Sequence, residues 1–154
     1  MEAPSYLDPR ARPQKYDPGP LEVVLGTAPA AGANFELVTP GRPGWLLLAV
    51  TFRLVTDANV ADRGVTVDYD DGNGSLFGSN GLQPVVAATT TELYSFQANR
   101  GQSEWNSKGQ AFSPLMPVEF QGGQKLQINV LSKQAGDQLD RIVMTFLRRD
   151  YAPS

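Results

Sequence analysis

The sequence predicts an all-β fold, a single β-sandwich of eight to nine strands behind an extended N-terminal arm. From residue 21 onward, short apolar runs alternate with turn signals at regular intervals, which is typical of a sandwich or barrel. No stretch keeps a 3.6-residue apolar period, so no amphipathic helix is expected. Five of the 12 prolines lie within residues 1–20. We therefore divide the chain into an arm, residues 1–20, and a sandwich domain, residues 21–154.

The first half of the domain predicts strands at residues 21–25, 34–38, 45–56 and 63–70. In the longest strand, the even positions 46–54 are all apolar and should form one inward face. The odd positions begin apolar, with Trp45 and Leu47, and end mostly polar. One half of this strand should therefore be covered on both sides, either by a loop or layer of the same chain or by a sister subunit. Trp45 and Leu47 are thus candidate subunit-interface residues.

The second half of the domain predicts strands at residues 124–131 and 139–148, each with apolar side chains at alternate positions. Residues 84–88 and 92–96 are two further runs that could form one long bent strand. Residues 115–120 form a proline-flanked strand, which favours an edge position. Residues 71–74 should form a turn. The polar stretch 99–113 is expected to be a long excursion that carries Trp105.

The arm has no residue spacing typical of a helix or a strand. Proline restricts φ and removes an amide donor, so the arm should be stiff and extended, spanning roughly 60 Å at about 3.1 Å per residue. Such a segment is either a mobile tail or a strap docked on a partner, and we favour the docked strap. Its candidate partner-binding residues are Tyr6, Leu7, Pro9, Arg10, Arg12, Pro13 and Tyr16.

Composition excludes several kinds of chemistry. The chain has no histidine and no cysteine, so imidazole catalysis, His-ligated metals, thiolate sites and disulfides are all excluded. The net charge of −3 argues against a nucleic-acid surface. There is no apolar run long enough for a membrane span, and we expect no secretory signal. The absence of cysteine fits a protein made in a reducing cytoplasm. We expect neither enzymatic activity nor a cofactor or metal.

Three local patterns have alternative interpretations. Asp68, Asp70 and Asp71 could suggest calcium, but their spacing does not match the helix-loop-helix site, and a solvated hairpin tip explains them equally well. The other acids are scattered and do not mark a glycosidase pair. Trp105 is a candidate surface contact that could stack on a sugar ring, or it could cover the end of the core. The polar residues near it are Gln102, Glu104 and Asn106.

Two stretches of the sequence combine long strands with distinctive turns. In residues 44–74 a long strand ends in TDANVADR, and a second strand leads to an acidic, glycine-rich turn. In residues 121–147 a Gly-Gly hairpin and a QAGDQ turn precede the last strand. Both stretches resemble small virion proteins of tailed bacteriophages. The resemblance implies a jelly-roll sandwich of the capsid decoration (cement) type, without catalytic residues.

On this resemblance, we expect the protein to bind the major capsid protein and to self-associate, as a homotrimer, on the exterior of a capsid assembled in the host cytoplasm. Extended arms also occur in head–tail connectors and tail components, so these remain alternatives. A carbohydrate-binding module for host recognition, centred on Trp105, is the alternative of another class.

Overall fold

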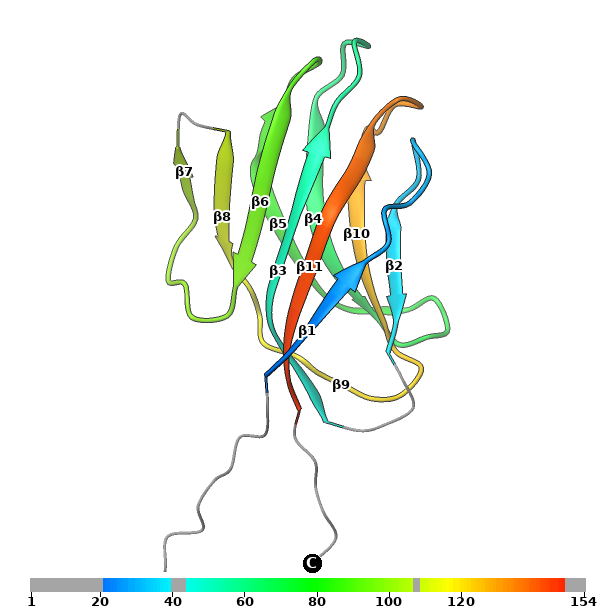
Figure 1. The fold of residues 1–154 in the computed structure, drawn as a ribbon, viewed down its shortest axis with the longest axis vertical. Helices are drawn as coiled ribbons and strands as arrows, with labels where there is room; N and C mark the ends of the chain where they lie inside the picture. Colours follow the sequence, from blue (N-terminus) through cyan, green and yellow to red (C-terminus); the bar gives the residue numbers. More distant parts are fainter. Residues whose placement is uncertain (1–20, 40–43, 107–108, 149–154) are drawn as a thin grey trace, which may run out of the picture.

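The computed structural model describes residues 21–39, 44–106 and 109–148, and within them the fold is all-β (Figure 1). Two sheets face each other across an apolar core, which confirms the predicted β-sandwich. The strands are β1 (Leu21–Gly26), β2 (Phe35–Val38), β3 (Trp45–Val55), β4 (Arg63–Asp70), β5 (Leu76–Val86), β6 (Thr91–Gln97), β7 (Glu104–Asn106), β8 (Gln110–Pro114), β9 (Glu119–Phe120), β10 (Lys125–Leu131) and β11 (Gln138–Arg148).

The larger sheet has the strand order β1-β11-β3-β6-β8-β7, with the short β9 paired to the beginning of β3. Its pairs are antiparallel except for β6 and β8, which run parallel. A parallel pair departs from the antiparallel jelly-roll pattern, so the jelly-roll topology stays a prediction. β1 and β7 form the two edges of this sheet.

The smaller sheet has the order β2-β10-β4-β5 and is antiparallel throughout. The alternation predicted for its strands is confirmed, because Val65 and Val67 of β4 and Leu126 and Ile128 of β10 are all buried in the core. The residues between them face outward and are mostly polar. Period-2 patterning therefore placed the inner face of this sheet correctly.

β3 does not keep one inward face, because it contains a β-bulge at Leu48. The pairing with β11 shifts between Thr145 and Phe146, which leaves Leu48 as an extra residue on β3. Leu47 lies on the core side before the bulge and Val50 lies on the core side after it, and both are fully buried. The expectation that the even positions 46–54 share one inner face is therefore wrong for Leu46 and Leu48, which are only half-buried. The bulge accounts for the apolar odd positions at the beginning of the strand, because Trp45 and Leu47 lie on the core side before it.

Other sequence predictions differ from the structure in strand number and position. β5 begins at Leu76, well before the run predicted at 84–88, and a turn around Thr89 (φ 53°) separates it from β6. The excursion 99–113 contains β7 and β8. Of the strand predicted at 115–120, only Glu119–Phe120 is in a strand. These short strands are held by pairing with distant segments, since β9 pairs with β3, β8 pairs with β6, and β7 pairs with β8.

Candidate interaction surfaces

The outer side of β1 is an apolar strip at the edge of the larger sheet. Leu21, Val23 and Leu25 are 65%, 60% and 75% exposed, whereas Val24 between them packs against the core. β1 pairs along its whole length with β11, and among the described residues no strand pairs with its other side. An edge strand with neither charge nor proline on its exposed face is one that proteins usually cover.

A groove of about 430 Å³ separates the edge strands of the two sheets, β1 and β2. Leu25, Phe35 and Leu37 contribute apolar side chains to it. Gly26 allows β1 to come this close, because a Cβ there would lie 2.9 Å from Cε2 of Phe35 and 2.7 Å from Cγ2 of Ile142. On the core-facing side of β1, the Glu22 carboxylate lies 3.5 Å from the Nε of Arg148. The β1 edge therefore has an apolar outer face and an acidic group on the opposite face.

Exposed apolar side chains at the start of β5 and in the connection between β8 and β9 form a second apolar surface. Figure 1 shows these segments at the end of the sandwich where β1 begins and β11 ends. Leu76, Phe77 and Met116 are 56%, 44% and 44% exposed there. The Phe77 ring joins a series of aromatic contacts through Tyr69 and Phe120 into the core, with centroids 6.0 and 6.4 Å away. This surface is therefore rigidly supported from beneath.

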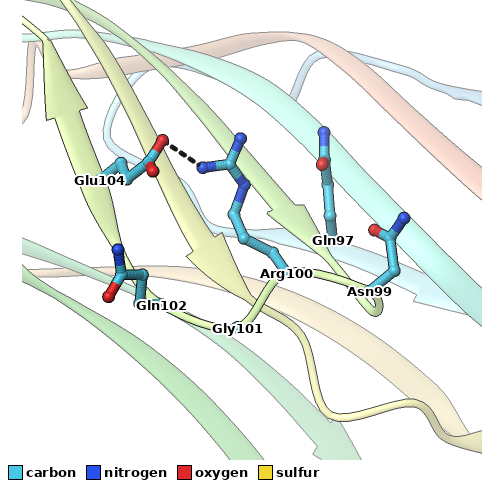
Figure 2. Close-up of a pocket in the computed structure, with 6 residues that line it drawn as sticks. All are labelled: Gln97, Asn99, Arg100, Gly101, Gln102 and Glu104. Atoms are coloured by element: carbon cyan, nitrogen blue, oxygen red, sulfur yellow. Dashed lines mark hydrogen bonds and ion pairs between the residues drawn. The ribbon is translucent and has the colours of Figure 1, made fainter.

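A shallow polar pocket of about 370 Å³ lies in the connection between β6 and β7 (Figure 2). The Arg100 guanidinium pairs with the Glu104 carboxylate at 2.7 Å and lies over the Phe112 ring, 4.4 Å from its centroid. A second depression of about 400 Å³ adjoins it and adds Leu48 and Ala49 of the β3 bulge. The residues that line the polar pocket are Gln97, Asn99, Arg100, Gly101, Gln102 and Glu104.

The most buried charged cluster lies at the opposite end of the sandwich and holds loops together. The Arg63 side chain is fully buried, and its Nε and Nη2 donate to the Asp137 carboxylate at 3.0 Å each. Nη2 also donates to Asp57 at 2.8 Å, and Nη1 donates to the carbonyls of Asn59 and Ala61. All the donors of this guanidinium are thus used within the fold, which is a structural role.

The electrostatics of this cluster favour ionised carboxylates. Burial alone raises the pKa of the Asp137 carboxyl, but hydrogen bonds from Arg63 and from backbone amides lower it below its ordinary value. Burial likewise raises the pKa of Asp57, and the amides of Asn59 and Gly136 outweigh it, so that this pKa is also lowered. On the outer face of the larger sheet, the hydrogen bond from Arg53 lowers the pKa of Asp140.

The candidate calcium residues form turns and hydrogen bonds instead of a common site. Asp70 and Asp71 accept hydrogen bonds from the amides of Gly72 and Asn73, at 2.7 Å each, at the tip between β4 and β5. Asp68 lies on the outer face of the smaller sheet and accepts from the Asn129 amide at 2.6 Å. Within the described ranges, no three carboxylates gather closely enough to hold a metal ion.

The candidate interface residues have different positions. All seven arm residues lie outside the described residues, so their role stays a prediction. The prediction of Leu47 as a subunit-interface residue is wrong, because its side chain lies on the core side of the bulge and is fully buried within the chain itself. Trp45 is half-buried, with its ring 4.8 Å from that of Phe146. The backbone of Trp105 pairs with Ala111 in β7, and its side chain is outside the description.

Sequence reasoning missed two features of the structure. Gln97, Asn99 and Arg100 join Gln102 and Glu104 in the polar pocket, although nothing in their spacing marked them. The edge position of β1 was also missed. Its alternating exposed Leu and Val residues were an available signal, but alternation alone does not say which strand lies at an edge.

Comparison with known proteins adds little. No family model matches the chain, and no curated protein matches it. A chain in the crystal structure of the T13 IBDV viral particle is similar, with 12% identity and a TM-score of 0.41. The match covers 86% of this chain and 32% of that one, so this chain spans about a third of its length. A similarity of this size supports no argument about function. The described part of the chain also has no helix with the length and hydrophobicity of a membrane span.

Proposed function

We propose that this protein is a non-enzymatic structural component of a virus particle, and specifically a decoration (cement) protein on the capsid exterior of a tailed bacteriophage. The observation that carries the proposal is the placement of exposed apolar surface. Leu76, Phe77 and Met116 lie at the end of the sandwich where β1 begins, which is where the proline-rich arm joins the domain. The two phage-like stretches of the sequence point to the same class of protein.

The proposed mechanism needs no chemical step. The apolar end of the sandwich contacts the shell, while Tyr6, Leu7 and Tyr16 of the arm enter grooves on adjacent subunits of the major capsid protein. Prolines lower the entropy lost on docking, because an extended chain gives up fewer conformations. Joining arm and body in one homotrimer adds avidity, so that modest single contacts hold the shell tightly.

Co-sedimentation with expanded capsid shells tests this function. We expect the full chain to pellet with shells, and the change of Phe77 to aspartate to weaken binding at least tenfold, since a charge would be buried at the contact. Val60→Asp is the matched control, because Val60 is 97% exposed and lies between β3 and β4, at the other end of the sandwich. Deletion of residues 1–20 should also abolish binding and leave the domain folded. Equal binding by all these variants would contradict the proposal.

Two alternatives remain. A head–tail connector or tail-associated protein would use the same surfaces, and it would bind connector rings but not shells. A carbohydrate-binding module is favoured by one observation, the gathering of amide and charged side chains in the pocket of Figure 2. Host glycans would then retain the protein on a column, and Gln97→Ala or Trp105→Ala would abolish retention. Shell binding without glycan retention would exclude this alternative.

A further inference from the structure

We infer that residues 9–14 of the arm of a second copy add to β1 as a parallel edge strand. This contact between copies is separate from the proposed shell contact, so it can be tested without a shell. Three observations carry it: the edge of β1 that no described strand pairs with, the positions of the arm prolines, and the distribution of apolar and charged side chains on both segments.

The arm prolines are spaced so that one side of an extended chain keeps all its amides. Between Pro4 and Pro18, the prolines fall only at the odd positions Pro9 and Pro13. In an extended chain the backbone groups of alternate residues point to opposite sides, so residues 6–16 can offer an unbroken ladder through their even positions. Pro9 and Pro13 would then face outward. This is where edge strands tolerate proline, and it blocks further strand addition.

The backbone groups of Leu21, Val23 and Leu25 point to the free edge. The Ala98 amide donates to the Leu48 carbonyl at 2.9 Å, so from Leu48 onward the even residues of β3 point to β6 and the odd ones to β11. Carrying this alternation across the pairs Thr51↔Val143 and Val24↔Met144 leaves the odd residues of β1 pointing outward. The edge therefore offers a ladder of three residues.

These two ladders fit best when the strands are parallel. In a parallel pair, a residue whose backbone groups bond to the partner strand lies opposite a residue whose backbone groups point away from it. The even arm residues bond toward β1, and the even β1 residues point away from the arm. Even arm residues therefore lie opposite even β1 residues. Arg10 then faces Glu22 across the core-facing side. On the outer side Pro9, Ala11 and Pro13 lie beside Leu21, Val23 and Leu25. An antiparallel arm would instead place Arg10 and Arg12 among those three apolar side chains.

A parallel arm must come from another copy. Parallel neighbours in one chain need a connection of a dozen or more residues, whereas only residues 15–20 separate this segment from β1. Each copy would both give an arm and accept one. Such a heterologous contact closes in a ring, and a trimer would contain three of these contacts. Tyr6, Leu7 and Tyr16 lie outside the paired residues and stay available for another partner.

Disulfide trapping tests the contact directly, because the natural chain has no cysteine. We expect full-length Ala11→Cys chains to cross-link to Val23→Cys chains when the two are mixed under mild oxidation. Leu131→Cys is the matched control acceptor, because Leu131 is 56% exposed but lies on the smaller sheet. Pro13→Cys should link to Leu25→Cys in preference to Leu21→Cys. Three results would overturn the inference. Pro13→Cys could link to Leu21→Cys in preference to Leu25→Cys, or the cross-link could form only within single chains of an Ala11→Cys/Val23→Cys double variant. The third is a yield of the Ala11–Val23 cross-link no higher than that with Leu131→Cys.

Proline substitution gives an independent readout in sedimentation of the full chain. Arg12→Pro removes an amide that would bond to β1, and Arg12→Ala removes the same charge but keeps the amide. We expect Arg12→Pro to associate about fivefold more weakly than Arg12→Ala, the effect of one net hydrogen bond. Ala11→Pro should associate as the natural chain does, because its amide points away. Equal effects of Ala11→Pro and Arg12→Pro would contradict the parallel ladder.

Discussion

Replacement of Arg63 by methionine should be the most destabilising single charge removal in the described part of the chain. The variant keeps an unbranched apolar stem in place of the arginine stem but leaves the Asp137 carboxylate, whose side chain is 1% exposed, without a cation. It also leaves the carbonyls of Asn59 and Ala61 without their guanidinium donor. Breaking a buried pair from one side costs about 3–5 kcal/mol. With a urea slope of about 2 kcal/mol per M, the unfolding midpoint should fall by about 2 M.

The matched control is Arg53→Met, which removes the partly exposed ion pair between Arg53 and Asp140. The side chains of these two residues are 29% and 25% exposed. Exposed pairs contribute about 0–1 kcal/mol, so its midpoint should move by less than about 0.5 M.

The pH dependence of stability follows from the lowered pKa of Asp137. Its ordinary value is 3.8, so its contribution is complete above about pH 4 and is lost as the pH falls through the folded-state pKa. The difference in urea unfolding midpoint between Arg63→Met and the natural chain should therefore be smaller at pH 3 than at pH 7. Equal costs for Arg63→Met and Arg53→Met at pH 7 would refute the reasoning.

Two further predictions concern single groups. Tyr94→Phe should raise the free energy of unfolding by about 1 kcal/mol, because the Tyr94 hydroxyl is buried with no hydrogen-bond partner in the described structure. Tyr69→Phe should lower it by about 1–2 kcal/mol. The Tyr69 hydroxyl donates to the Met116 carbonyl at 2.8 Å and accepts from the Asn80 amide at 2.9 Å. Thermal unfolding of the pair measures both, and a change of the same sign in both would contradict the assignment. Gly136→Ala should cost about 1–3 kcal/mol, since its Cβ would lie 2.8 Å from Oδ2 of Asp57, whereas Gly101→Ala meets open space and should be neutral.

The parts of the fold that the sequence predicted are those whose burial alternates, which are β10 and the part of β11 that follows its register shift after Asp140. Ile142, Met144 and Phe146 of β11 and Leu126 and Ile128 of β10 were expected inside and are buried. Each lies on a strand with one buried face, where a shift by one residue would expose the whole apolar set. Local pattern is sufficient there because it coincides with the tertiary arrangement.

The bulge in β3 shows where local pattern fails. Leu46 and Leu48 are as apolar as Leu47, so composition gave no reason to break the alternation. The break is decided by β11, because its register changes between Thr145 and Phe146. A bulge belongs to the pair of strands and cannot be located from either strand alone. The strand β8 could not be located from its own residues either, because it is defined by its parallel pairing with β6.

The charged cluster at Arg63 could not be predicted for a different reason. Its carboxylates belong to Asp57 and Asp137, which lie in two connections between strands that are far apart in the sequence. Once the sheets stack, these loops meet at one end of the sandwich and their charges must be paired, because unpaired charges there would be costly. The opposite end has exposed leucine, phenylalanine and methionine side chains instead of such a cluster. The molecule thus has one end whose buried charged groups are paired internally and one end with exposed apolar side chains, and β1, which follows the arm in the sequence, begins at this second end.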